Sequence, residues 1–146
     1  VKKLGLTCFV DTNGSLPFKK LPKLVEVTDS FMLDIKAFDN EEHIFITKSK
    51  VDTVLENADY LASIDKLFEI RTVTVAGMDN RTTVDKITKM LSKYIKMGHK
   101  IRYKIIKYRK FGVREEYSMF SSPTDEEMEE LKQIALDNGF CDVVIV

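Results

Sequence analysis

Short runs rich in β-branched and aromatic residues alternate with helical patterns along the chain, at a spacing of about 30 residues. Strand length is reached in residues 6–10, 31–35, 68–75, 101–106 and 142–146. This alternation predicts βαβ units and an α/β fold with a parallel sheet, in which right-handed crossovers stack the strands in chain order. The first, second and fifth runs are almost continuously apolar, which predicts strands covered on both faces. The pattern leaves open whether the sheet is flat or part of a barrel.

Helices are expected between these runs, and three of them have a clear start. Ser49 and Thr124 each begin a capping-box-like pattern, and Thr82 or Thr83 is expected to open a further helix. No linker or low-complexity stretch interrupts the chain. Residues 1–146 are therefore predicted to form a single domain.

Composition excludes several classes of function. Lys plus Arg and Asp plus Glu both total 23, so the net charge of zero argues against a nucleic-acid binder. No apolar run approaches the roughly 18 residues that a membrane span requires. Cys8 and Cys141 are the two cysteines, too few for a multi-bridge scaffold or a cluster, so we expect a cytoplasmic protein with both thiols in its core. His43 and His99 are isolated and are not candidates for catalysis or metal binding.

Polar residues follow the predicted strands at the point where each strand ends. They are Asp11, Thr12, Asn13, Asp34, Lys36, Lys107 and Arg109, and the third strand itself carries Arg71. We expect them to converge, because ligands of parallel α/β folds bind at the carboxyl ends of the strands. Asp11 and Asp34 would repel each other on neighbouring strands unless Lys36 or a bound metal ion lay between them. A ligand with a positive centre and a carboxylate would also suit such a rim.

Other interpretations of the same residues stay open. Residues 11–14 also suit a simple turn, which Asp, Asn and Gly commonly build. A metal-dependent α/β enzyme that uses Asp11 and Asp34 is one alternative function, and a non-catalytic α/β binding module is another. Residues 9–16 also resemble the first motif of haloacid-dehalogenase-type phosphatases, but Asn13 stands where that family needs its general acid.

Two motifs lie about 20 residues apart, Asp-Thr-Asn-Gly at residues 11–14 and Met-Leu-Asp-Ile-Lys at residues 32–36. Residues 70–77 follow in the same order as a third segment. Together they resemble the radical S-adenosylmethionine activating enzymes of glycyl radical enzymes, among which the activators of pyruvate formate-lyase are best known. The resemblance implies a partial, six-stranded TIM-barrel-like (β/α) fold. The chain would supply the last four barrel strands and a further C-terminal strand.

The same resemblance implies the site residues. Contacts to S-adenosylmethionine are implied for Asp34, Lys36, Arg71, Val73, Thr12, Asn13 and Arg109. A small cation that helps to hold the ligand's carboxylate is implied at Asp11, Thr12, Met32 and Asp34. Arg109 stands where activators of pyruvate formate-lyase often have a His, which leaves the identity of the partner enzyme open.

A larger departure from the family lies at the start of the chain. The Cys-x3-Cys-x2-Cys motif that binds a 4Fe–4S cluster and the Gly-Gly-Glu segment that binds the methionine amino group are both absent. With Val1 as its first residue, the chain is expected to be the C-terminal portion of an activating enzyme. The intact parent would cleave S-adenosylmethionine reductively and form a glycyl radical on its partner, whereas this portion would hold no catalytic residue and would be inactive alone.

Two surfaces are expected to interact with other proteins. A basic loop formed by Lys107, Arg109, Lys110 and Arg114 would meet the glycine loop of the partner enzyme, unless it is simply solvated. The first strand would lack its neighbour in the barrel, and its open edge would invite non-native dimerisation.

Overall fold

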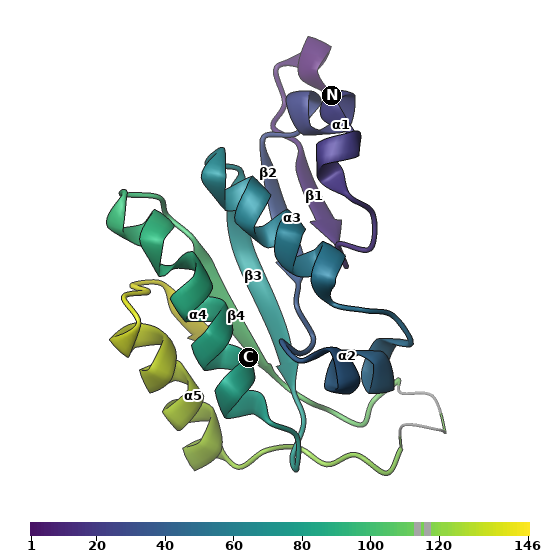
Figure 1. The fold of residues 1–146 in the computed structure, drawn as a ribbon, viewed down its shortest axis with the longest axis vertical. Helices are drawn as coiled ribbons and strands as arrows, with labels where there is room; N and C mark the ends of the chain where they lie inside the picture. The colour runs from purple at the N-terminus through teal and green to yellow at the C-terminus, as the bar shows by residue number, and fades with distance from the viewer. Residues whose placement is uncertain (113–114, 116–117) are drawn as a thin grey trace.

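The structure, a computed structural model, describes residues 1–112, 115 and 118–146 of the chain and contains one parallel sheet (Figure 1). Its strands are β1 (Phe9–Thr12), β2 (Ser30–Asp34), β3 (Leu67–Thr74), β4 (Arg102–Lys107) and β5 (Val143–Ile145). They lie in the order β1-β2-β3-β4-β5, and every neighbouring pair is parallel. The predicted parallel α/β fold with strands in chain order is therefore confirmed, and β1 lies at one edge of the sheet.

Helices connect the strands and lie mainly over one face. They are α1 (Pro22–Val27), α2 (Asn40–Thr47), α3 (Asp52–Ser63), α4 (Asn80–Lys96) and α5 (Asp125–Asp137), with short 3-10 turns at Lys2–Leu4 and Phe18–Lys20. Figure 1 shows α3, α4 and α5 side by side over the same face of the sheet. Among the described residues, no helix combines the length and the apolar character that crossing a bilayer requires.

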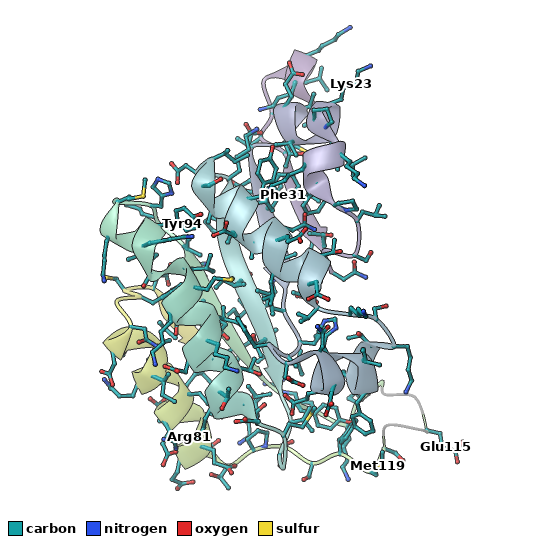
Figure 2. The ribbon with its side chains drawn as sticks, viewed as in Figure 1. Lys23, Phe31, Arg81, Tyr94, Glu115 and Met119 are labelled. Atoms are coloured by element: carbon teal, nitrogen blue, oxygen red, sulfur yellow. The ribbon has the colours of Figure 1, made fainter. Side chains whose placement is uncertain are left out.

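The two faces of the sheet differ in burial. Toward the helices, the strands present Phe31, Leu33, Ile70, Tyr103 and Ile105, each with 0% of its surface exposed. Phe31, labelled in Figure 2, packs against Phe18, and the centroids of the two rings lie 5.0 Å apart. Successive side chains of a strand point to opposite faces, so the residues between these core positions form a second face.

The prediction that three strands are covered on both faces is wrong. Strand β2 alternates between buried and half-buried residues, β1 alternates between exposed and half-buried ones, and all of β5 is half-buried. A run of apolar letters concealed this alternation because Met32 and Phe9 are apolar residues on the second face. The helices leave that face open.

One predicted helix start is confirmed and two are wrong. Thr124 forms the expected capping box with Glu127 at the start of α5. Helix α3 instead begins after Val51, whose backbone N–H donates to the Asn40 side chain 2.8 Å away. Helix α4 begins after Asp79, whose carboxylate accepts from the Thr82 N–H. The Asn40 amide and the Asp79 carboxylate accept from the backbone N–H groups at these two helix starts, so neither Ser49 nor the predicted threonines cap a helix.

Neither cysteine lies in the core. Cys8 precedes β1 and is half-buried, and its backbone N–H donates to a carboxylate oxygen of Asp29 at 2.7 Å. Cys141 is exposed in the turn before β5. The expectation that both are core residues is therefore wrong, because each lies outside the strands that form the packed layer.

Candidate functional site

Three adjoining hollows lie along the carboxyl edge of the sheet. The first, of about 390 Å³, is lined by Asn13, Asp34, Lys36 and residues of α2 and α3. The second is about 200 Å³ and mostly apolar, with Lys36, Val73 and Tyr108 in its wall. The third, of about 430 Å³, shares Val73 and Tyr108 with the second and includes Arg109. The structure therefore brings five of the implied cofactor residues to one edge.

The turn after β1 is built by its own side chains. Thr12 Oγ1 accepts from the Gly14 N–H at 3.0 Å, and Asn13 Oδ1 accepts from the Ser15 N–H at 3.1 Å. Gly14 has a φ of +67°, and a Cβ there would lie 2.6 Å from Leu33 Cδ1. Only glycine fits between the turn and β2, so the simple turn interpretation describes what Thr12 and Asn13 do in this structure.

Asn57 of α3 holds the same segment through hydrogen bonds, a role that the sequence did not indicate. Its buried amide donates to the carbonyl oxygens of Gly14 and Leu16, each at 2.8 Å, and accepts from the Phe18 N–H at 2.9 Å. A buried amide with all these partners rigidifies a loop, because leaving any of them unpaired is costly. A single Asn in an amphipathic helix gives no sequence signal for such a role.

Asp34 and Lys36 form an ion pair at the end of β2. The Lys36 Nζ lies 2.8 Å from Asp34 Oδ2, and both side chains are roughly one quarter exposed, at 29% and 26%. The Ile35 peptide between them is held on both sides: its N–H donates to the Arg71 carbonyl at 2.8 Å, and its carbonyl accepts from Thr72 Oγ1 at 2.9 Å.

A buried tyrosine supports this peptide from the core. Tyr103 OH lies 2.9 Å from Thr72 Oγ1. Because the Thr72 hydroxyl uses its hydrogen to donate to the Ile35 carbonyl, the Thr72 oxygen accepts from the Tyr103 phenol. Burial raises the pKa of Tyr103, although the hydrogen bond to Thr72 opposes it, so the phenol keeps the proton that it donates. The chain of hydrogen bonds links the centre of the core to the Asp34–Lys36 pair.

Arg71 connects three strands on the open face. Its Nε donates to Glu69 Oε1 at 2.6 Å, its Nη1 to Asp11 Oδ2 at 2.7 Å, and its Nη2 lies 3.0 Å from Met32 Sδ. Burial by itself would lower the pKa of the guanidinium, but the hydrogen bonds to Glu69 and Asp11 outweigh it and raise the pKa. Arg71 thus supplies positive charge beside Asp11.

Glu69 is the central acid of this face, and the sequence interpretation missed it. It is 1% exposed, yet Lys104 Nζ lies 3.2 Å and Arg102 Nη1 3.7 Å from its carboxylate, in addition to Arg71. A bulge places it there: Phe31 pairs with Leu67 and Met32 with Glu69, so Phe68 is the extra residue. The available signal was Glu-Ile-Arg in a strand, which puts acid and base on one face.

The residues implied as ligands of a small cation already have partners within the protein. Arg71 contacts Asp11 and Met32, Lys36 contacts Asp34, and Thr12 holds the turn. Within the described part of the chain, no three His, Cys, Asp or Glu side chains form a group that could hold a metal ion. A cation at these donors would therefore have to displace Arg71 from Asp11.

The predicted basic loop is only partly free in the structure. Lys107 pairs with Asp125, and this hydrogen bond lowers the pKa of that carboxyl group. Arg109 and Lys110 are exposed. Arg114, the fourth residue of the predicted loop, lies outside the described residues.

Comparison with known proteins finds relatives by sequence, although no family model matches the chain. The pyruvate formate-lyase-activating enzyme of Streptococcus mutans is 33% identical over 76% of this chain and 44% of its own length. The pyruvate formate-lyase 1-activating enzyme of Escherichia coli K12 is 31% identical over 94% of this chain and 59% of its own length. The chain thus spans about half the length of these relatives.

A solved structure resembles the fold. A domain of pyruvate-formate lyase-activating enzyme from Bacteroides vulgatus superposes with a TM-score of 0.79, at 16% identity, and the match covers 99% of this chain and 84% of that one. At this level of identity the match concerns the fold alone. It agrees with the parallel α/β architecture described above.

Proposed function

Because this chain is a sequence relative of the activating enzymes of glycyl radical enzymes, we propose that it is the C-terminal part of such an enzyme. In this proposal, residues 1–146 form the wall of a radical S-adenosylmethionine barrel, and the open face of the sheet faces its interior. The parent would form a glycyl radical on a partner enzyme. The alternatives, a non-catalytic module or a metal-dependent enzyme using Asp11 and Asp34, gain no support from these relatives.

The observation that supports this proposal best is the polarity of the adjoining hollows. Residues with polar side chains, among them Asn13, Asp34 and Lys36, line most of the first hollow, and Lys36 and Val73 line the mostly apolar one beside it. S-adenosylmethionine has a charged amino-acid end and a flatter nucleoside end, so it needs both kinds of surface within one molecule's length. Lys36 lies between the two hollows, where it would meet the middle of such a ligand.

The side chains at this edge would bind and orient the ligand. Lys36, which lines both hollows, and Arg71, which pairs in register with Asp34 of the neighbouring strand, are the donors proposed for a carboxylate, and charge-assisted hydrogen bonds of this kind are the stronger ones. Asp34 offers oxygens to hydroxyl or ammonium groups, while the Tyr103–Thr72–Ile35 hydrogen bonds hold its backbone in place. Reductive cleavage is the chemistry that a bound 4Fe–4S cluster supplies in this family, and the protein contributes position and electrostatics.

The 146 residues contain two cysteines, whereas the cluster motif of the family needs three. We therefore propose that this portion is inactive alone and that its cluster ligands belong to another part of the parent. Arg109 and Lys110, exposed after β4, are the residues proposed to face the glycine loop of the partner enzyme. A cytoplasmic location stays a prediction.

The coding sequence that precedes Val1 provides the first test. It should encode Cys-x3-Cys-x2-Cys followed by Gly-Gly-Glu, and its absence would refute the radical mechanism. The second test is a calorimetric titration of the isolated chain with S-adenosylmethionine, where we expect weak binding or none. Tight binding would show that the essential contacts lie in this portion and not in the proposed remainder.

The residue-level test uses the full-length protein with its cluster assembled anaerobically. Replacing Lys36 by Met should weaken S-adenosylmethionine binding about tenfold or more, the loss expected when a hydrogen bond to a charged group is removed. Lys132→Met in α5, a residue that lines none of the three hollows, is the matched control and should bind normally. Equal affinity of both variants would contradict the placement of the ligand at this edge.

A further inference from the structure

Arg71 is a long side chain with a defined position, and the position requires a cause. A free arginine side chain populates many rotamers, and ordering such a chain has an entropic cost. The described contacts give Arg71 two carboxylate partners of different character, Glu69 and Asp11. Which of them fixes the guanidinium can be read from their burial.

The Glu69 contact is the anchored one. The Glu69 side chain is 2% exposed, and the Nε–Oε1 distance of 2.6 Å is shorter than the distances of 3.2 Å to Lys104 and 3.7 Å to Arg102. Arg102 has a second partner in Asp142 at 3.0 Å, so it depends less on Glu69. Water screens such a buried contact little, and the bulge at Phe68 leaves the carboxylate facing Arg71.

The Asp11 contact is the exchangeable one. The Asp11 side chain is 58% exposed, whereas that of Arg71 is 18% exposed. Ion pairs in contact with solvent contribute little to stability, so this contact can break at little cost. Asp11 also lies in an edge strand, whereas Glu69 lies in a strand with neighbours on both sides.

We infer that Glu69 is the positioning residue of Arg71, and that Asp11 is the partner which Arg71 exchanges for an incoming anion. In the site proposed above, on which this inference rests, that anion is the carboxylate of S-adenosylmethionine. An arginine held at Nε keeps its two terminal nitrogens directed at the open face. The ordering cost is then met by folding and not by binding.

The inference predicts a spectroscopic result in the 146-residue chain without any ligand. The Arg71 Nε–H resonance should exchange slowly with solvent, and Glu69→Gln should accelerate its exchange about tenfold or more. Asp11→Asn should leave this rate within about twofold, since Asp11 contacts Nη1. Slow exchange in Glu69→Gln, or equal acceleration in Asp11→Asn, would overturn the inference.

A second variant separates positioning from the charge balance of the face. Glu69→Gln leaves Lys104 without its carboxylate, which by itself can destabilise the sheet. The double variant Glu69→Gln/Lys104→Met removes that unpaired charge and should recover stability, measured by the unfolding midpoint, but not slow Nε–H exchange. Recovery of both would mean that Glu69 acts only as a general counter-ion.

A binding experiment in the full-length protein links the inference to the site. Glu69→Gln and Arg71→Gln should weaken S-adenosylmethionine binding by similar factors, and the double variant should lose no more than Arg71→Gln alone. Additive losses would overturn the positioning role. If neither variant affects binding while Glu69→Gln still frees the Nε–H, the proposed function fails and the link between Glu69 and Arg71 stands.

Discussion

The two faces of the same sheet achieve burial in opposite ways. Toward the helices, Phe31, Leu33 and Ile105 have no exposed surface and need no partner beyond apolar neighbours. On the open face, Glu69 is almost equally buried, but only with cations from its own strand and from β4 around it. Apolar packing dominates the first face, with a few buried hydrogen bonds such as that between Thr72 and Tyr103, whereas the second depends on charge pairs.

Parallel sheets are normally covered on both faces, so an open face with this much charge is unusual. Burying a charge is costly unless it is paired, and removing one member leaves the others uncompensated. A face of this kind gains little stability over an apolar one. We propose that its residues serve the site at the carboxyl edge, and the following variants test how separate the two faces are.

The largest effect is expected from neighbouring residues on opposite faces. Leu33→Ala removes a fully buried side chain and should lower the free energy of unfolding by about 2–5 kcal/mol. Met32→Ala, one residue earlier and half-buried, should cost less than about 1.5 kcal/mol. Chemical denaturation measures both, and an equal cost would show that the open face contributes to the core after all.

The second effect concerns the turn that rests on β2. Gly14→Ala should lower the free energy of unfolding by about 2–4 kcal/mol, because left-handed strain adds to crowding against Leu33. Gly5→Ala is the matched control: its φ of +69° is similar, but a Cβ there would meet nothing within 4 Å. The control should cost only about 1–2 kcal/mol of strain. Indistinguishable losses would mean that the turn is not seated on Leu33.

The third effect concerns the hydrogen bonds that connect the core to the end of β2. Thr72→Val leaves both the Ile35 carbonyl and the Tyr103 phenol without their partner, and should cost about 1–3 kcal/mol by denaturation. Tyr103→Phe leaves Thr72 still bonded to Ile35 and should cost less. If Tyr103→Phe proves the more damaging variant, the phenol has another role in the core.

The smallest effect lies on the outer side of the helical layer. A hydrogen bond from Lys93, helped by one from the phenol of Tyr94 (Figure 2) and opposed by partial burial, lowers the pKa of Asp59 below its ordinary 3.8. A lowered pKa stabilises the fold above the ordinary value, and this contribution is lost as the pH falls through the lower, folded value.

Asp59→Asn should therefore remove less than about 1 kcal/mol above the ordinary carboxyl pKa and nothing at more acid pH. Unfolding midpoints between neutral and strongly acid pH measure this difference. A constant offset at every pH would assign the effect to lost packing of Tyr94 and not to charge.

The sequence was sufficient to predict the order and direction of the strands, because the side-chain periods of strands and helices differ and can be recognised in short segments. It was insufficient for which face is open, since Met32 has an apolar side chain whichever way it points. Glu69 was missed for a related reason: its alternation partner Arg71 is local, but Lys104 and Arg102 come from a strand more than thirty positions later. Local patterns do not contain such pairings.

The residues of the candidate site also differ in whether the sequence could place them. Asp34 and Lys36 could be placed at a strand end because polar residues after an apolar strand are visible in the sequence, and Arg71 could be placed within the next strand. Asn57 could not, because its partners are backbone atoms of a distant turn. The functional roles of these residues stay predictions, since what the sequence determined is their location.

The order of the strands also has a consequence for synthesis. Each described strand pairs with the strands that precede and follow it in the chain, so the partner of every new strand has already been synthesised. Because synthesis runs from the N-terminus, we expect each strand of this sheet to become available for pairing after its neighbour. Arg71 would meet both Asp11 and Glu69 once β3 has emerged, whereas Glu69 would gain Lys104 and Arg102 only with β4. Full compensation of Glu69 would thus mark the arrival of the fourth strand.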